Sequence, residues 1–175
     1  IYALAANTGL FSWVNQISGS NNETCGDLIG DAGSLYMIGN YHTQIIPPGL
    51  AAVPGSATED LFLLGLNNNL GSTQWIDLSP TMTATDALGK CLIQDSGGNI
   101  WFVGEWEGTV NIAGSNLEAS SGGKDIMVVE YNNSGVYQTH YVVKSITDII
   151  CEDLAVDGSD EFYLGGSTTA NSTFG

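Results

Sequence analysis

The stretch "GGKDIMVVEYNNSGVYQTHY" (residues 122–141) repeats the pattern of "TEDLFLLGLNNNLGSTQW" (residues 58–75). Each has an Asp, a short and mostly apolar run, an Asn-rich segment with a Gly, and a second extended run. Asp60 recurs as Asp125, and the Asn-rich segments keep the same spacing of 65 residues. Two extended runs joined by an Asn, Gly and Ser turn predict a β-hairpin. A shortened version of this hairpin stands at residues 1–18.

A second pair of extended runs follows each of these hairpins. Its turn begins with an Asp, whose carboxylate can accept backbone N–H groups and stabilise the reversal. The three copies are "CGDLIGDAGSLYMIGNY" (25–41), "KCLIQDSGGNIWFVGEW" (90–106) and "CEDLAVDGSDEFYLGGS" (151–167), with the turn residues Asp31, Asp95 and Asp157. Each repeat unit therefore holds four short strands, and helical patterns are almost absent.

Four-stranded antiparallel units in tandem are typical of β-propeller blades. We therefore predict an all-β fold with about three repeats, at residues 1–60, 61–125 and 126–175, the third of them incomplete. A β-solenoid is the alternative, although its rungs are usually far shorter than these units. Propellers typically have four to eight blades, so three repeats predict a part of a larger repeat protein. An oligomeric propeller made of two such chains is the alternative.

The charge and the residue composition exclude several classes of partner and site, beginning with nucleic acid. The chain has 19 acidic residues, three Lys and no Arg, for a formal charge of −16. Such a surface repels phosphate groups, so we expect no binding to nucleic acid. No window of 18 apolar residues is present, and we expect no membrane span. Cys25, Cys91 and Cys151 are widely spaced, which predicts buried small side chains and neither a disulfide framework nor a zinc site.

Residues 95–135 resemble the tandem propeller repeat often called the SBBP type. That repeat reads D-x-x-G-N, three hydrophobic residues, x-G, an aromatic-x-G-T step, then G-x-D, four hydrophobic residues and a Gly-containing turn. The residues that fit in order are Asp95, Gly98, Asn99, Gly104, Trp106, Gly108, Thr109, Gly123, Asp125 and Gly135. The first copy lacks the Gly-Thr step, and the third has Ser-Asp-Glu at 159–161 in place of Gly-Asn.

The resemblance implies a β-propeller, usually within secreted or surface-attached bacterial proteins and sometimes in large DNA viruses. It implies roles in adhesion, recognition or scaffolding, and no shared enzymatic activity. We therefore expect a non-enzymatic extracellular or cell-surface scaffold that binds protein, with a virion surface as the alternative location. Its recognition loops would follow Gly39, Gly104 and Gly165. A lectin-like propeller that binds glycans is the second hypothesis, and a propeller glycosidase or lyase is the third.

The candidate ligand-binding residues lie where the recognition loops begin. They are Tyr41, His42, Glu105, Trp106 and Glu107. Residues i and i+2 of a strand share a face, so the two Glu could form the carboxylate pair of a glycosidase. The favoured interpretation is that Trp106, matched by Tyr41, packs inward while its Glu neighbours face water. Neither G-x-S-x-G nor H-E-x-x-H occurs, so we predict no catalytic residues and no zinc site.

Other patterns have structural explanations that we favour. The turn residues Asp31, Asp95 and Asp157 could bind calcium, but the EF-hand spacing is missing and turn capping suffices, so no cofactor is expected. The four Trp could stack on sugars, although Trp13 and Trp75 recur at matched positions, which favours packing between strands. His140 is interpreted as a packing residue at a strand end. Possible glycosylation sequons begin at Asn22, Asn132 and Asn171.

Overall fold

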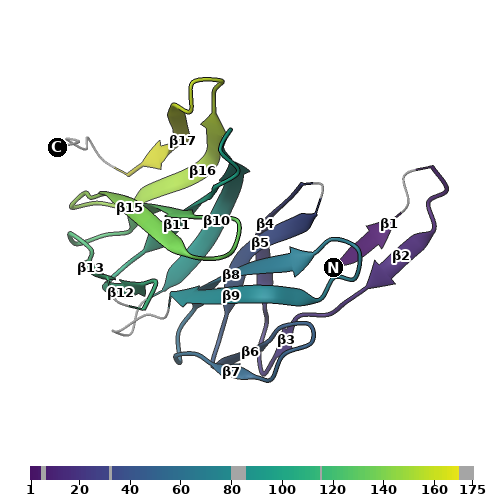
Figure 1. Ribbon diagram of the computed structural model, residues 1–175. Helices are drawn as coiled ribbons and strands as arrows, with labels where there is room; N and C mark the ends of the chain where they lie inside the picture. The colour runs from purple at the N-terminus through teal and green to yellow at the C-terminus, as the bar shows by residue number, and fades with distance from the viewer. Residues whose placement is uncertain (5–6, 32, 80–85, 115, 170–175) are drawn as a thin grey trace.

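The computed structural model describes residues 1–4, 7–31, 33–79, 86–114 and 116–169, and the regular elements in these ranges are all β-strands (Figure 1). Two sheets have four strands each, and all strand pairs in them are antiparallel. The predicted all-β class and the four-stranded antiparallel units are therefore confirmed. Within the described ranges, no helix has the length and apolar character needed to cross a bilayer.

The two four-stranded sheets have the same strand order. The first runs β4 (Thr24–Gly30), β5 (Ser34–Tyr41), β8 (Asp60–Asn67) and β9 (Thr73–Ser79). The second runs β10 (Ala87–Gln94), β11 (Ile100–Trp106), β14 (Asp125–Tyr131) and β15 (Tyr137–Val143). Each sheet therefore begins in one predicted repeat and ends in the next, because a sequence period fixes the length of a unit and not its starting residue.

A two-stranded hairpin stands at each end of this pair of sheets (Figure 1). The N-terminal hairpin consists of β1 (Tyr2–Leu4) and β2 (Phe11–Val14), and the C-terminal hairpin of β16 (Ile149–Val156) and β17 (Phe162–Thr168). Two small sheets lie beside the main ones: β3 (Ser18–Gly19) with β6 (Gln44–Ile46) and β7 (Val53–Pro54), and β12 (Thr109–Ile112) with β13 (Asn116–Ala119).

Irregularities in register identify which hairpins correspond. In β4–β5, β10–β11 and β16–β17 the register shifts next to the pairs Cys25–Gly39, Gly89–Gly104 and Cys151–Gly166. Gly166, and not Gly165, therefore matches Gly39 and Gly104. In β1–β2, β8–β9 and β14–β15 the register shifts instead at the turn end of the hairpin, and the unpaired residue is in the second strand. These shifts lie between Ala3 and Leu4, Gly65 and Leu66, and Glu130 and Tyr131. The N-terminal hairpin thus corresponds to the second half of a sheet, and the C-terminal hairpin to the first half.

The central strands are buried on both faces, because each sheet packs against a neighbour on either side. In β8, Leu61 and Leu63 belong to the cluster between the two four-stranded sheets, whereas Phe62 and Leu64 belong to a cluster on the opposite face. The second sheet places Phe102 in the first of these clusters and Val103 in a third, which also contains residues of β16. Burial on both faces explains why these strands are nearly continuous apolar runs.

The predicted turn caps are confirmed. The Asp31 carboxylate accepts the backbone N–H groups of Gly33 and Ser34, both at 2.8 Å. Asp95 accepts the N–H of Asn99, and Asp157 accepts those of Ser159 and Glu161. Cys91 and Cys151 are buried as expected, but Cys25 is exposed, which corrects the expectation for that residue.

Candidate functional site

Two of the five predicted ligand-binding residues are core residues. Tyr41 ends β5 and is fully buried, and Trp106 ends β11 with 1% of its surface exposed. They occupy matched positions, since Tyr41 lies opposite Asp60 and Trp106 opposite Asp125 in the strand register. The interpretation that Trp106 packs inward is confirmed. Neither ring is available to a ligand on the surface of this chain.

The recurring Asp at the start of the third strand holds a neighbouring loop. Asp60 is fully buried and accepts the backbone N–H of Ser56 at 2.5 Å and its hydroxyl at 2.9 Å. Asp125 is also fully buried and accepts the backbone N–H groups of Ser121 and Ser145, both at 2.7 Å. Each carboxylate therefore supplies a hydrogen-bond acceptor to N–H or O–H groups that folding removes from water.

Glu105 corrects a prediction. The sequence predicts that this side chain faces water, but only 2% of its surface is exposed. One carboxylate oxygen accepts the backbone N–H of Cys151 at 2.8 Å and lies 3.4 Å from the Lys90 ammonium. Asn40, at the matched position of the first sheet, accepts the backbone N–H of Gly89 at 2.7 Å. The side chain before the terminal aromatic residue therefore bonds each sheet to the next one.

Replacing Glu105 with Ala should loosen the C-terminal hairpin. The substitution removes the acceptor for a buried N–H, and a bond to a charged group typically contributes about 1.5–3 kcal/mol. We expect faster hydrogen exchange at the Cys151 amide and a free energy of unfolding lower by roughly that amount. Glu105→Gln keeps an amide oxygen in place and should lose less. Equal exchange rates in Glu105→Ala and in the exposed control Glu107→Ala would contradict this role.

The two carboxylates that flank Trp106 lie in different environments. Glu105 is buried and bonded, whereas the Glu107 side chain is exposed and its backbone N–H bonds to the carbonyl of Asp86 at 3.1 Å. His42, the remaining predicted residue, is half-buried, and its Nε2 lies 3.4 Å from a carboxylate oxygen of Glu59. The structure therefore does not gather the five predicted residues into one site.

His42 borders a shallow polar hollow of about 590 Å³. The rest of its lining is Gly19, Ser20, Asn21 and Asn22. Asn22 begins a sequon and is exposed here. The amide oxygen of Asn132, a second sequon residue, accepts the N–H groups of Ser134 and Val136 inside a turn. Asn171, the third, lies outside the described residues.

Sequence reasoning missed a groove between the two four-stranded sheets, which we call the inter-sheet groove. Its volume is about 520 Å³, and it is lined by Asp31, Gly33, Ser34, Tyr36, Gln74, Trp75, Asn133 and Ser134. These residues come from the β4–β5 hairpin, from β9 and from the β14–β15 turn. The groove could not be found from the sequence, because its three segments are brought together only by the stacking of the sheets.

Trp75 forms one wall of this groove and joins the two sheets. Its indole N–H donates to the carbonyl of Asn133 at 3.3 Å, and its ring packs against Gly65 and Gly135 so closely that a Cβ at either glycine would overlap it. Gly135 also has a positive φ of 79°. Trp13 repeats this contact, since its indole N–H donates to the Asn68 carbonyl at 2.9 Å. The expectation that these matched Trp pack between strands is confirmed.

The groove also carries polar groups of several kinds. The backbone N–H groups of Gly33 and Ser34 hold the pKa of the Asp31 carboxyl below its ordinary value of 3.8. Gln94 donates to the same carboxylate at 3.3 Å, and the Ser34 hydroxyl lies 3.4 Å from the Gln74 amide oxygen. The Tyr36 ring centroid is 6.0 Å from that of Trp75. The groove thus combines a carboxylate, amides and a hydroxyl with aromatic edges.

The pKa values of two aspartates should lie on opposite sides of the ordinary value, with Asp31 below it and Asp77 above it. Because the pKa of Asp31 is lowered, its contribution to stability is present above pH 3.8 and is lost as the pH falls through its folded pKa. Burial raises the pKa of Asp77, although Tyr131 donates a hydrogen bond to it. Its contribution is therefore present at low pH and is lost as the pH rises through its raised pKa. Carboxyl NMR titration should show Asp31 ionising first, and the reverse order would contradict both assignments.

His140 belongs to a polar network that links β15 to β13. Its Nδ1 bonds to the Tyr137 hydroxyl at 2.7 Å, and its Nε2 lies 3.3 Å from Glu118. The Lys144 ammonium donates to the other oxygen of Glu118 at 2.9 Å, which is the main reason that the pKa of Glu118 is lowered. His140 is half-buried, so it packs at the sheet surface while making polar bonds.

Comparisons with known proteins identify no family: no protein-family model matches the chain, and no curated protein matches it. Within the described ranges, no three of the His, Cys, Asp and Glu side chains are grouped so that they could hold a metal ion.

Proposed function

We propose that this chain is a non-enzymatic β-propeller scaffold of the SBBP type, outside the cell or on a virion, that binds protein partners through its outer loops. One observation carries the proposal. The carboxylates that recur between repeats, together with Glu105, accept backbone N–H groups of the fold. These carboxylates hold loops and join sheets through backbone hydrogen bonds. The repeat therefore favours a structural role over a catalytic one.

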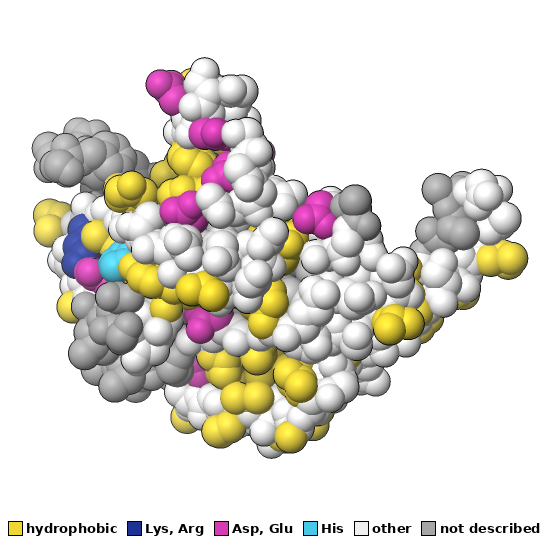
Figure 2. All heavy atoms as spheres, in the orientation of Figure 1, with side chains coloured by type: hydrophobic (Ala, Val, Ile, Leu, Met, Phe, Trp, Pro, Cys, Tyr) yellow, Lys and Arg dark blue, Asp and Glu magenta, His cyan; other side chains and the backbone are white. Residues whose placement is uncertain are grey.

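The outer loops supply the surface that differs between copies. Residues 49–54, which we call the 49–54 turn, comprise the end of the connection between β6 and β7 and β7 itself, and they include no charged residue although the chain carries −16. Leu50 is 43% exposed, and Ala51, Ala52 and Pro54 are exposed beside it. Figure 2 shows hydrophobic side chains gathered in the lower part of the view, where Figure 1 places β6 and β7. Exposed apolar patches of this kind favour contact with proteins.

An adhesion assay tests this function. Surfaces coated with the chain should retain cells, or proteins isolated from cell surfaces, better than surfaces coated with albumin. Leu50→Asp places a charge in the apolar turn and should abolish retention, whereas Leu70→Asp, in a different exposed turn, should preserve it. Equal retention by both variants would exclude the 49–54 turn. Hydrolysis of a polysaccharide by the purified chain would overturn the non-enzymatic assignment.

The inter-sheet groove favours a second candidate function, the binding of glycans. Aromatic edges beside carboxylate, amide and hydroxyl groups suit sugars, which present both apolar C–H faces and hydroxyls. Binding on a glycan array should be lost in Gln74→Ala, because Gln74 lines the groove, and retained in Gln138→Ala, which lies on the exposed side of β15. An array without signal for the folded wild-type chain would exclude this candidate.

A further inference from the structure

The two terminal hairpins are complementary halves of one sheet. In both complete sheets, the second strand of the first hairpin pairs with the first strand of the second hairpin, as β5 with β8 and β11 with β14. By register, β17 matches β5 and β11, and β1 matches β8 and β14. In the described part of the chain, β17 pairs with β16 and β1 pairs with β2, and neither has the second neighbour that its counterparts have.

The edge of β17 lacks the features that protect exposed strands from pairing. Natural edge strands usually carry charges or Pro, or are very short. β17 has seven residues, "FYLGGST", with no charge and no Pro, in a chain with 19 acidic residues. Tyr163 is 54% exposed and Leu164 is 42% exposed. The residue that matches Leu164 in the second sheet, Phe102, is fully buried.

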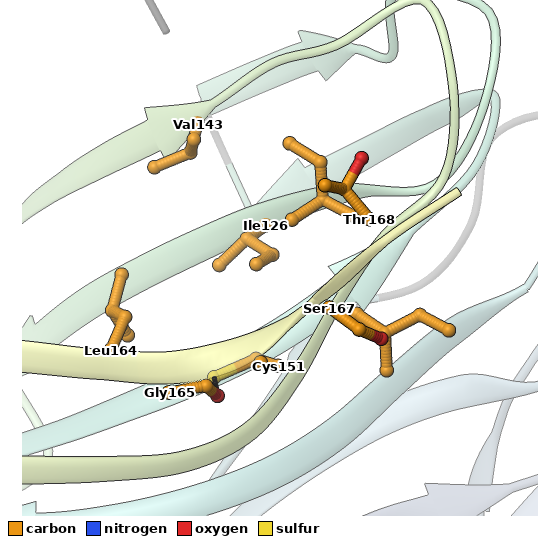
Figure 3. Close-up of a pocket in the computed structure, with 10 residues that line it drawn as sticks. Ile126, Val143, Cys151, Leu164, Gly165, Ser167 and Thr168 are labelled. Atoms are coloured by element: carbon orange, nitrogen blue, oxygen red, sulfur yellow. Dashed lines mark hydrogen bonds between the residues drawn. The ribbon is translucent and has the colours of Figure 1, made fainter. Parts of the chain in front are cut away.

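An apolar hollow lies at each end of the molecule. The hollow beside β17 has a volume of about 210 Å³, and its lining includes Ile126, Val143, Ile149 and Leu164 (Figure 3). The hollow beside the N-terminal hairpin has a volume of about 360 Å³, and its lining includes Ile1, Val14, Met37 and Phe62. Both lie where a half sheet meets a complete one, so the missing half of each sheet would stand next to them.

We propose that a second copy of this chain completes each half sheet, so that β1 of one copy pairs antiparallel with β17 of the other. The register of the complete sheets fixes the pairs: Leu164 opposite Tyr2, Tyr163 opposite Ala3, and Phe162 opposite Leu4 of the second copy. The association buries two uncharged edges and covers both hollows. The inference rests on strand register and does not depend on the recognition role proposed above.

Two residues that are exposed in the single chain, Gly165 of β17 and Cys25 of β4, match residues that are buried inside it. Gly165 matches Ile38 and Val103, both fully buried between sheets. Cys25 matches Gly89 and Cys151, whose N–H groups bond to a side chain of the preceding sheet. In the dimer, a mixed sheet precedes the first complete sheet of each copy. Gly165 and Cys25 then become buried as their counterparts are.

Two copies would give a ring of a size known for propellers. In the ranges that the structure describes, each copy has two four-stranded sheets and, at either end of them, a hairpin that matches half of one. Two copies joined at both ends would hold six complete sheets, inside the usual range of four to eight in a closed ring, whereas three copies would exceed it. The contact between β1 of one copy and β17 of the other occurs twice, and two-fold symmetry relates the two contacts. The charge of −16 on each copy opposes association, so added salt should strengthen the dimer.

Sedimentation equilibrium tests the dimer with a matched pair of variants. The wild-type chain should sediment with twice its 18.4 kDa mass. Gly165→Asp adds a Cβ whose nearest neighbour is the Asp153 carbonyl at 4.0 Å, so the monomer accepts it, but it places a carboxylate at the buried position of the dimer. Gly158→Asp makes the same change in a turn with no atom within 4 Å. We expect Gly165→Asp to be monomeric and Gly158→Asp to remain a dimer.

A monomeric wild-type chain at high salt, or equal dissociation of the two variants, would overturn the proposal. Disulfide trapping then tests the register. With Cys25→Ser as background, chains with Ala3→Cys and chains with Tyr163→Cys should cross-link when mixed, since directly opposite Cβ atoms are about 4.5–5.5 Å apart. Val136→Cys, exposed in the β14–β15 turn, replaces Ala3→Cys as the control. Equal cross-linking of both mixtures would show association by some other surface.

Discussion

Asp125→Ala should lower the free energy of unfolding by about 3–5 kcal/mol, because it deprives two buried N–H groups of a charged acceptor. The carboxylate is fully buried and bonds Ser121 and Ser145 at 2.7 Å, one on each side of it in the chain. Alanine provides no acceptor, and the site is closed to water. Urea denaturation should show a lower midpoint with an unchanged slope, since the surface exposed on unfolding is the same.

Asp157→Ala is the matched control for this prediction. Its carboxylate also accepts two backbone N–H groups, from Ser159 and Glu161, but in an exposed turn where water can replace it. We therefore expect a small change in the urea midpoint. If the two alanine variants lost equal stability, burial would not be the reason that Asp125 matters.

Phe102→Ala should cost about 3–5 kcal/mol through the cavity that it leaves between the two four-stranded sheets. The Phe102 ring is fully buried, and its centroid lies 6.1 Å from that of Tyr131. Both sheets contribute to the cluster around it, so neither can close the cavity alone. Thermal unfolding should begin at a lower temperature, and the transition should show whether the two sheets still unfold together.

The same Phe→Ala substitution at an exposed position shows how much of the loss at Phe102 comes from packing in the core. Phe11 is 67% exposed in the N-terminal hairpin, and Phe11→Ala should change the free energy of unfolding by no more than about 0.5 kcal/mol. A loss at Phe11 comparable to that at Phe102 would contradict the assignment of the core.

Local rules predicted the strands and turns correctly, because these depend on neighbours in the chain. The Asp31 turn and the inward position of Trp106 follow from hydrogen-bonding capacity and from the matching of repeats. The position of Glu105 could not be predicted in this way. A charged residue in a strand usually marks a face in water, but here a second sheet covers that face and offers it the N–H of Cys151.

The sheet boundaries show a second limit of the sequence. A hairpin between two others has a neighbour on each side along the chain, and the repeat does not say which of them it joins in a sheet. The answer lies in the positions of register shifts, such as the one next to Cys25 and Gly39, which depend on the folded backbone. The inter-sheet groove has the same origin, since Asp31, Trp75 and Asn133 are distant in sequence.

The bonds between successive sheets recur in kind, with Asn40 bonded to Gly89 and Glu105 to Cys151. Each sheet is therefore coupled mainly to its immediate neighbours, and the stability of such an array is close to a sum over units and interfaces. Unfolding in a single chain should start at the two terminal hairpins, which have one neighbour each, and proceed inward. Deleting one whole sheet from the middle should shorten the array while creating an interface of the same kind.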